Sequence, residues 1–406
     1  MVISKNPEAR LSAFGCEVLA RIAIYHTKNF NVSESKEQNE ADLQQARFIS
    51  RLCATSASFT NHIRRNLFRL PAALTFTENT VEITCRDATL KFVDSVELIF
   101  FLELIQPRFD KIIYNGTFFY RADLLKICNA LIGDQPGGCS CFDKNTLLKF
   151  DKLGNDNAYG TLIEKLSTHV KRIEVDDEFA AQLRDKDVRY DFLKVKSHTR
   201  VETYYTKSYF DIYAVEYDLR NVCTLTNLIM FSIEDFDLEP RDYVKKIWMS
   251  LGENETDESI ENGAKYLQAF TPDLEYLSLT QHRGLIFGNA EVAYQAATQI
   301  EKFIESKYGY LAVKFPKVKL DITLELLIYL KGTALTDKIN WFEEISKKYP
   351  ETKRVLTESN TQALLIERKG IKEGDKITIR VHTKDGEYVE SDGNSKFPHL
   401  APSVFE

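Results

Sequence analysis

The residues with the clearest chemical potential lie at the end of a short apolar run near the C-terminus. Residues 363–370 read ALLIERKG, so four apolar residues lead directly into a Glu-x-Lys made by Glu367 and Lys369. At a strand end, this pair is half of the motif of Mg²⁺-dependent nucleases, in which the carboxylate holds the metal and the lysine stabilises charge at phosphorus. A second carboxylate from an earlier element completes such a site, and Asp337 and Asp321 are the best upstream candidates. The motif raises the hypothesis of a nuclease, of the kind found in defence or mobile-element systems.

The same residues also fit the end of an ordinary surface strand. Asp337 opens an expected helix, where the helix dipole alone favours a carboxylate. After Lys369 the sequence continues as GIKEGDKITIRV, which is typical of a plain hairpin. In a chain with 28% charged residues, a Glu-x-Lys also arises readily by chance. We therefore treat the solvated strand end as the leading interpretation and the nuclease as the alternative.

Three arginines mark a second candidate, a surface that could contact phosphates. The stretch NHIRRNLFRL, residues 61–70, contains Arg64, Arg65 and Arg69 beside apolar residues and is expected to be helical. Arg65 and Arg69 are four residues apart and would share one helix face. Such a face can grip nucleic-acid phosphates, although in an acidic chain it more often pairs with neighbouring carboxylates.

Other motifs with known chemistry are incomplete. Cys139 and Cys141 flank one serine in a glycine-rich loop, but a zinc site needs further ligands and the closest histidine is His169. The chain has neither a Gly-x-Ser-x-Gly motif nor a Gly-x-Gly-x-x-Gly after a strand. His282 and Arg283 precede an expected helix whose N-terminus could bind an anion. We assign no metal ligands from the sequence, and no cofactor except Mg²⁺ under the nuclease hypothesis.

Length and composition indicate a globular protein of several domains. The 406 residues exceed the usual size of one core, and 44% of them are apolar. The net charge of −7, from 53 basic and 60 acidic residues, argues against broad coating of nucleic acid, which depends on neutralising phosphates. The negative net charge is still compatible with a local groove lined by basic residues.

Cysteine usage and hydropathy favour a soluble, cytoplasmic protein. Seven cysteines are scattered without a framework, which is typical of reduced thiols. The N-terminal residues include Lys5, Glu8 and Arg10, where a signal peptide needs an apolar run. The most apolar window, VELIFFLELI at 96–105, is too short and too charged to span a bilayer. It could instead form a core helix or part of an interface.

Elements expected from the pattern define an α+β fold, in which antiparallel β-hairpins and meanders pack with helices in two or three lobes. Glycine-rich and acidic stretches at 133–143 and 251–263 separate these lobes. The boundaries predict an N-terminal helix-plus-hairpin lobe at 1–135, a middle lobe with an antiparallel β-block at 144–250, and a C-terminal lobe at 264–406.

Local signals predict several individual elements. Alternation at 73–95 predicts a β-hairpin or meander, the Asn-Gly between 111–114 and 117–120 predicts a hairpin, and a helix of about 122–132 should end at Gly133. The β-block at 200–235 should form two or three antiparallel strands. Further expected elements are helices at 11–28, 41–54 and about 157–190, a long helix at 290–308 stopped by Gly309, a strand at 310–315, a helix at 337–349 and a β-meander tail at 361–390. The run at 320–332 fits a buried helix or a buried strand.

Function is inferred mainly from what the sequence lacks. No complete catalytic constellation occurs, so we favour a non-enzymatic intracellular interaction or regulatory protein. It would bind a protein or nucleic-acid partner or form a homo-oligomer, without a membrane. The Mg²⁺-dependent nuclease, with Glu367, Lys369 and Asp337 as site residues, is the alternative.

Overall fold

The structure is a computed structural model that describes residues 46–54, 56–66, 68–85, 88–116, 121–133, 141–151, 156–176, 180, 183, 188–196, 209–225, 240–251, 256–287, 291–330, 343–356 and 362–385. It separates into two compact units. The first unit contains Met1–His198 and Asp211–Tyr213, and the second contains Thr199–Phe210 and Ala214–Glu406. The three-lobe division stays a prediction, and the expected helix at 11–28 and Asp337 lie outside the described residues.

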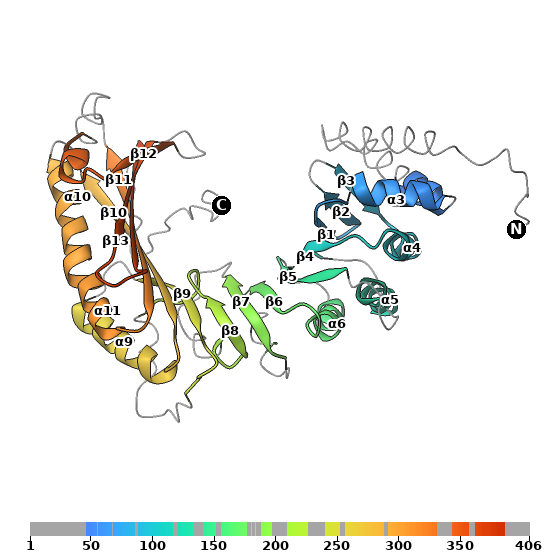
Figure 1. Ribbon diagram of the computed structural model, residues 1–406, viewed down its shortest axis with the longest axis horizontal. Coiled ribbons are helices and arrows are strands. Elements are labelled where there is room, and N and C mark those ends of the chain that lie inside the picture. Colours follow the sequence, from blue (N-terminus) through green and yellow to red (C-terminus); the bar gives the residue numbers. More distant parts are fainter. Residues whose placement is uncertain are drawn as a thin grey trace, which may run out of the picture. The chain divides into compact units, whose positions relative to one another are not determined.

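The first unit is a mixed sheet with helices that connect its parallel strands (Figure 1). Its strand order is β7-β6-β5-β4-β1-β2-β3. The strands are β1 (Ala72–Phe76), β2 (Val81–Cys85), β3 (Ala88–Phe92), β4 (Phe109–Tyr114), β5 (Phe142–Phe150), β6 (Arg172–Asp176) and β7 (Tyr190–Lys196). The helices are α3 (Ala57–Asn66), α4 (Ser95–Ile105), α5 (Arg121–Ile132) and α6 (Asp156–Leu166).

Helix α4 forms because a capped start precedes a well-placed apolar stripe. Asp94 is the N-cap, and its side chain accepts a hydrogen bond from the Val96 backbone N–H at 2.7 Å. The buried stripe repeats at helical spacing and consists of Leu98, Phe101, Leu102 and Ile105. The apolar window at 96–105 is therefore a core helix of the first unit.

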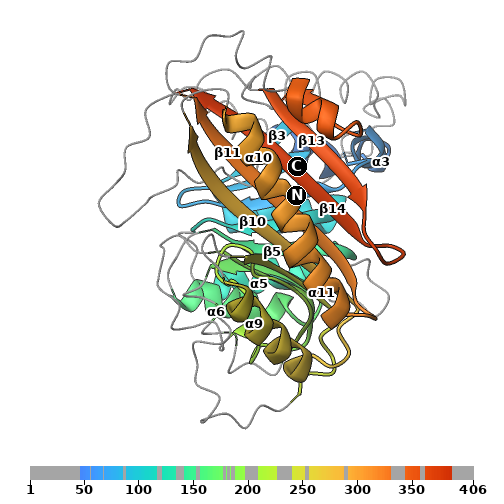
Figure 2. The ribbon, with the colours of Figure 1, turned by 90° about the vertical axis from the view of Figure 1, so that its left-hand side faces the viewer.

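The second unit has the strand order β8-β9-β10-β11-β14-β13-β12. Its strands are β8 (Ala214–Asp218), β9 (Lys246–Leu251), β10 (Tyr276–Phe287), β11 (Lys319–Leu330), β12 (Lys353–Leu356), β13 (Gln362–Lys369) and β14 (Lys376–Asp385). The helices are α9 (Asp257–Phe270), α10 (Glu291–Lys302) and α11 (Gly309–Lys314), with the π-helical η4 (Phe303–Tyr308) between the last two. Figure 2 shows α9, α10 and α11 lying across one face of this sheet.

Most strand pairings are parallel, which corrects the expected antiparallel architecture. From β4 to β7 and from β8 through β11 to β14, each pairing between neighbours described here is parallel. Antiparallel pairs occur at the β1–β2–β3 and β12–β13–β14 ends. The protein is thus a mixed α/β protein in which most of the described strand pairings are parallel.

Two expected antiparallel features are wrong for this reason. β4 is flanked on both edges by parallel strands, β1 and β5, so Asn115-Gly116 does not return the chain beside it. In the predicted antiparallel block at 200–235, the described strand β8 instead pairs in parallel with β9, and residues 201–208 and 226–235 of the block lie outside the described residues. The expected helical zone at 157–190 also contains β6 between its helices. The meander predicted at 73–95 is confirmed as the antiparallel strands β1, β2 and β3, and the end of α5 at Gly133, with φ 79°, is also confirmed.

The C-terminal elements also differ partly from expectation. Gly309 does not stop the long helix, because it adopts right-handed helical angles (φ −55°, ψ −45°) and the helix continues to Lys314. The predicted strand at 310–315 is therefore mostly α11, whose Leu311 and Ala312 extend the buried stripe. The ambiguous run is strand β11. The predicted turn between β13 and β14 is confirmed, with Gly374 at φ 86°.

Candidate functional site

One face of the second unit's sheet is polar, and no described helix lies on it (Figure 1). Along β11, Ile322, Leu324 and Leu326 face the helices and are buried, whereas the alternating Asp321 and Thr323 are half-buried on the other side. Register extends this division across the neighbouring strands. We call the side away from the helices the polar strand face; its central residues are Asp218, Trp248, Tyr276, Ser278, Thr280, His282, Asp321, Thr323, Glu325, Thr378, Arg380 and His382.

A charged cluster lies on three adjacent strands of this face. His282 on β10, Glu325 on β11 and Arg380 on β14 are direct cross-strand partners. The His282 Nδ1 lies 2.9 Å from one Glu325 carboxylate oxygen, and the Arg380 Nη1 donates to the other at 2.9 Å. The Glu325 side chain is nearly buried, whereas His282 is 57% exposed and presents its imidazole to solvent.

Electrostatics within the cluster favour an ionised carboxylate. Burial alone would raise the pKa of Glu325, but the hydrogen bond and charge of His282 and the charge of Arg380 outweigh it, so the pKa is lowered. The neighbouring His382 is buried, and burial lowers its pKa against the opposing effect of Glu325. The polar strand face therefore combines a charged Glu325 carboxylate with a neighbouring His382 imidazole whose neutral form is favoured.

A second group on the same face combines aromatic rings with paired charges. Arg220 donates two hydrogen bonds to the buried Asp218 carboxylate, at 2.9 and 2.7 Å. The rings of Trp248 and Tyr276 lie 5.3 Å apart, and the Tyr276 hydroxyl donates to Asp321 at 2.9 Å. Burial, with the nearby Asp321 charge, raises the pKa of Tyr276 to about 12, so this hydroxyl stays protonated.

The Glu-x-Lys residues lie on the exposed edge region of the polar strand face. Glu367 contacts Lys376 at 3.2 Å and Lys353 at 3.3 Å, and the hydrogen bond from Lys376 is the main cause of its lowered pKa. Asp321 lies two strands away and two residues along, roughly 12 Å between Cα atoms. The two carboxylates also have different partners, since Asp321 accepts a hydrogen bond from Tyr276 and Glu367 contacts the two lysines.

The grouping of Glu367, Lys369 and Asp337 stays a prediction. Lys369 is exposed opposite Lys376, and Asp337 lies outside the described residues. Within the part of the chain that the structure describes, no three His, Cys, Asp or Glu side chains are grouped so as to hold a metal ion. Also within that part, no helix is long and apolar enough to cross a membrane.

The arginines of the predicted phosphate grip have different environments. Arg64 on α3 donates from Nε to the Ile105 carbonyl at 2.8 Å and from Nη2 to the Leu104 carbonyl at 2.6 Å. It thereby caps the C-terminal end of α4. Arg65 is exposed at the end of α3, and Arg69 is exposed beyond that helix.

In the first unit, three lysines on neighbouring strands share one buried carboxylate. The buried Glu174 on β6 contacts Lys149 on β5 at 3.8 Å and Lys194 on β7 at 3.4 Å, and it is also paired with Lys196. Burial would raise the pKa of Glu174, but these lysines lower it overall. Three cations therefore surround one carboxylate.

Sequence reasoning missed Glu325 and placed His282 in the wrong kind of element. His282 lies within β10 and not in a turn before a helix, and the Arg283 side chain is not among those described. The available signal was the period-two run Asp321, Thr323 and Glu325 inside an apolar segment, which indicates a strand with one polar face.

Comparison of the sequence with known protein families and with curated proteins found no match.

Proposed function

We propose that this chain is an intracellular interaction protein that binds a protein partner with the polar strand face of its second unit. The observation that carries the proposal is the partly exposed polar face, where several strands present ordered side chains while the described helices lie on the other face. Because the side chains stand on strands, the face is largely organised before binding, which reduces the entropy cost of association.

The composition of the face supports a protein partner. Trp248 and Tyr276 form an aromatic pair that is partly exposed, and Arg220 and Arg380 lie on the same face. Tryptophan, tyrosine and arginine are enriched among the residues that carry most of the energy of protein interfaces. We place the centre of the docking surface between Trp248 and Glu325.

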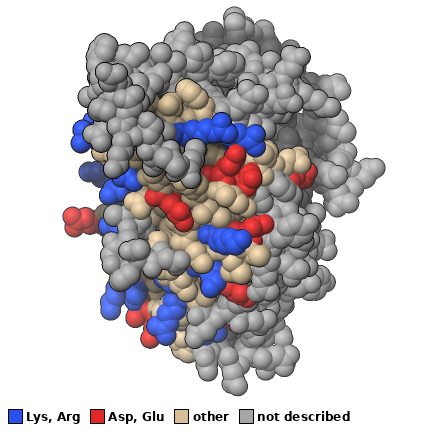
Figure 3. Space-filling model, turned by 90° about the vertical axis from the view of Figure 1, so that its right-hand side faces the viewer, with Lys and Arg blue, Asp and Glu red and all other residues tan. Residues whose placement is uncertain are grey.

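Charge pairing argues against a nucleic-acid partner for this surface. Arg220, Arg380 and Lys246 are each paired with a carboxylate, at distances of 2.7–2.9 Å. Binding of nucleic acid instead draws its affinity from cations that neutralise phosphates. On the face of the molecule in Figure 3, Lys and Arg side chains are likewise interspersed with Asp and Glu.

Buried thiols support the intracellular part of the proposal. Burial raises the pKa of Cys53 to about 11 and that of Cys128 to about 12, so both stay protonated near neutral pH. Such thiols are unreactive and act as small apolar core groups. Their use is compatible with a reducing compartment.

The test compares variants on the two sides of the same sheet. Trp248→Ala and Arg380→Ala alter the polar strand face, while Val313→Ala on α11 alters a residue that is 76% exposed on the helix side. Each tagged chain is expressed in the source cells, and captured proteins are quantified by mass spectrometry after nuclease treatment. Thermal unfolding first verifies that every variant is folded.

We expect one or more proteins to be captured by wild type and Val313→Ala and depleted in both face variants. Purified candidates should then bind the face variants roughly tenfold or more weakly, as expected for interface hot spots. Equal capture by all four chains would refute the proposed docking surface. Capture that disappears on nuclease treatment would point to nucleic acid as the partner.

A further inference from the structure

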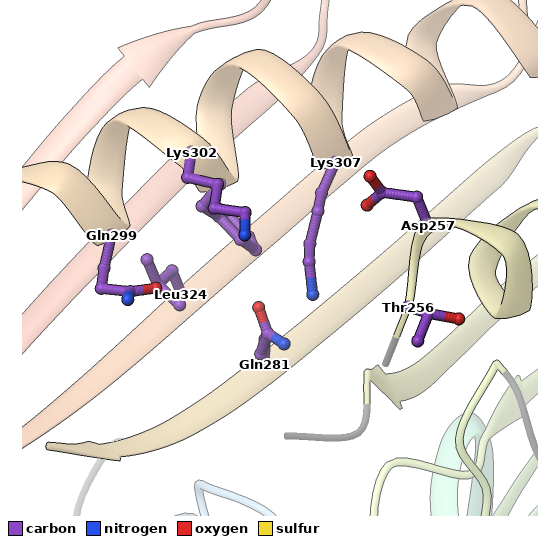
Figure 4. A pocket seen from close by; sticks show the side chains of 8 residues that line it. Thr256, Asp257, Gln281, Gln299, Lys302, Lys307 and Leu324 are labelled. Carbon is purple, nitrogen blue, oxygen red and sulfur yellow. The ribbon is translucent and has the colours of Figure 1, made fainter. Parts of the chain in front are cut away.

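A cavity of about 300 Å³ lies between the helices and the sheet of the second unit, on the side opposite the polar strand face. Figure 4 shows side chains from four elements around it: Lys302 from α10, Lys307 from η4, Gln281 from β10, and Asp257 from the start of α9. Phe303 and Leu324 add apolar lining. The volume is in the lower part of the range for small-molecule sites.

Gln281 interrupts an otherwise apolar strand face at this cavity. Leu277 and Leu279 precede it on the helix-facing side of β10, and its cross-strand partners are Leu251 and Leu324. Its side chain is nevertheless 1% exposed. Burial of a carboxamide requires polar partners that offset its desolvation, so Gln281 makes this part of the otherwise apolar strand face polar.

Lys307 interrupts the buried stripe of the helix that faces Gln281. Ile300 and Phe303 occupy the preceding positions of the stripe and are buried. Lys307 follows at helical spacing and is only 6% exposed. An ammonium group in this position carries a larger desolvation cost than a carboxamide.

The helix is also irregular where it meets the cavity. Residues Phe303–Tyr308 form a π-helical segment between the α-helical turns of α10 and α11. Such segments are rare and are frequently found at functional sites. It carries Phe303 and Lys307, so the irregular backbone and a buried cation occur together.

From these observations we propose that the cavity binds a small organic anion through a carboxylate or phosphate group. Lys307 provides the buried positive charge, and the exposed Lys302 provides a second charge at the mouth. The amides of Gln281 and Gln299 offer both donors and acceptors, and Asp257 can accept a hydrogen bond from a hydroxyl or amino group of the same ligand. This site is independent of the proposed protein interaction, which uses the other face of the sheet.

The test measures anion binding by isothermal titration calorimetry of the full chain. The probes are inorganic phosphate and acetate, each compared with chloride at equal ionic strength, and they separate a phosphate ligand from a carboxylate ligand. Lys307→Met removes the buried charge but keeps an unbranched apolar chain, and Gln281→Leu restores the apolar row. Lys317→Met removes a lysine that is exposed in the turn after α11 and is the matched control.

We expect saturable binding of phosphate or acetate, but not chloride, by wild type and Lys317→Met. Affinity should fall roughly tenfold or more in Lys307→Met, because a charge-assisted hydrogen bond is lost. If Lys307→Met does not fold, Lys302→Met should also lower the affinity for phosphate or acetate, by a smaller factor. The proposal fails if neither phosphate nor acetate binds more tightly than chloride, or if the pocket variants bind these anions as tightly as Lys317→Met does.

Discussion

Single residues set the properties of the polar strand face, as shown by the cluster of Glu325, His282, Arg380 and His382. Glu325 contacts the His282 imidazole through one carboxylate oxygen and accepts a hydrogen bond from Arg380 through the other. Removing one side chain of such a partly buried group would leave a charged partner without its counter-charge. The resulting loss of folding free energy exceeds the net stabilisation that the intact pair provides. The cluster is therefore sensitive to pH as well as to mutation.

The buried His382 should make stability depend on pH below neutrality. Burial is the largest influence on its pKa and lowers it, the Arg380 and His282 charges act in the same direction, and Glu325 opposes them. The unfolded chain keeps an ordinary imidazole, so below about pH 6.5 it binds more protons than the folded chain. The free energy of unfolding should consequently fall as the pH decreases through that value.

We expect His382→Asn to reduce this loss of stability between about pH 7 and pH 5.5, as measured by urea unfolding at several pH values. His169→Asn is the matched control, because His169 is exposed in a turn. If the free energy of unfolding depends on pH in the same way for wild type and His382→Asn, His382 is not the cause of the loss of stability.

Elements are joined in each unit by a few polar side chains that bind backbone groups. In the first unit, Arg64 links α3 to the last carbonyls of α4. In the second, the buried Asp375 accepts hydrogen bonds from the Tyr308 hydroxyl and the Leu320 backbone N–H, each at 2.9 Å. Asp375 thereby connects the β13–β14 turn with the long helix and with the start of β11.

Arg64→Met should destabilise the protein by about 1–3 kcal/mol, since it removes a charged donor from two carbonyls while keeping much of the aliphatic chain. The exposed neighbour Arg65 provides the control, and Arg65→Met should stay within about 0.5 kcal/mol of wild type. Chemical denaturation measures both. Equal effects would mean that the cap of α4 contributes nothing specific.

Tyr308 and Asp375 should be energetically coupled. Tyr308→Phe removes only the hydroxyl that donates to Asp375, and a loss of about 1–2 kcal/mol is expected. A double-mutant cycle with Asp375→Asn should give a coupling energy of about 0.5–3 kcal/mol. Additive losses in the cycle would show that the hydrogen bond does not contribute to stability.

At the scale of the whole chain, the balance of charge decides which partners are plausible. The net charge is −7, and Arg220, Arg380 and Lys246 of the polar strand face are each paired with a carboxylate. Glu367 of the Glu-x-Lys pair is itself in contact with two lysines. These pairings leave little positive charge on those surfaces for phosphates.

We therefore expect neither strong nucleic-acid binding nor Mg²⁺-dependent cleavage. Fluorescence anisotropy with duplex DNA, single-stranded DNA and RNA should show no saturable binding at about 0.15 M salt. Gel assays with and without Mg²⁺ should show intact nucleic acid for wild type and Lys369→Ala alike. Cleavage by wild type that is lost in Lys369→Ala would instead support the nuclease hypothesis.

Local sequence was sufficient for several elements and for one feature of the site. The β1–β2–β3 hairpins, the end of α5 at Gly133 and the β13–β14 turn follow from alternation, glycine and turn residues close together in the chain. The alternating Asp321, Thr323 and Glu325 also contain the information that β11 has one polar face. These signals depend only on neighbours within a few residues.

Only the tertiary structure decided which strands pair and which side chains meet. His282, Glu325 and Arg380 are separated by 43 and 55 residues, and parallel pairing of β10, β11 and β14 places them side by side. Strand periodicity specifies which residues share a face but not the neighbouring strand or its direction. Likewise, Gly309 is compatible with ending or continuing a helix, and packing of Leu311 and Ala312 decided in favour of continuation. Non-local packing, which no short window of sequence contains, therefore created the polar strand face.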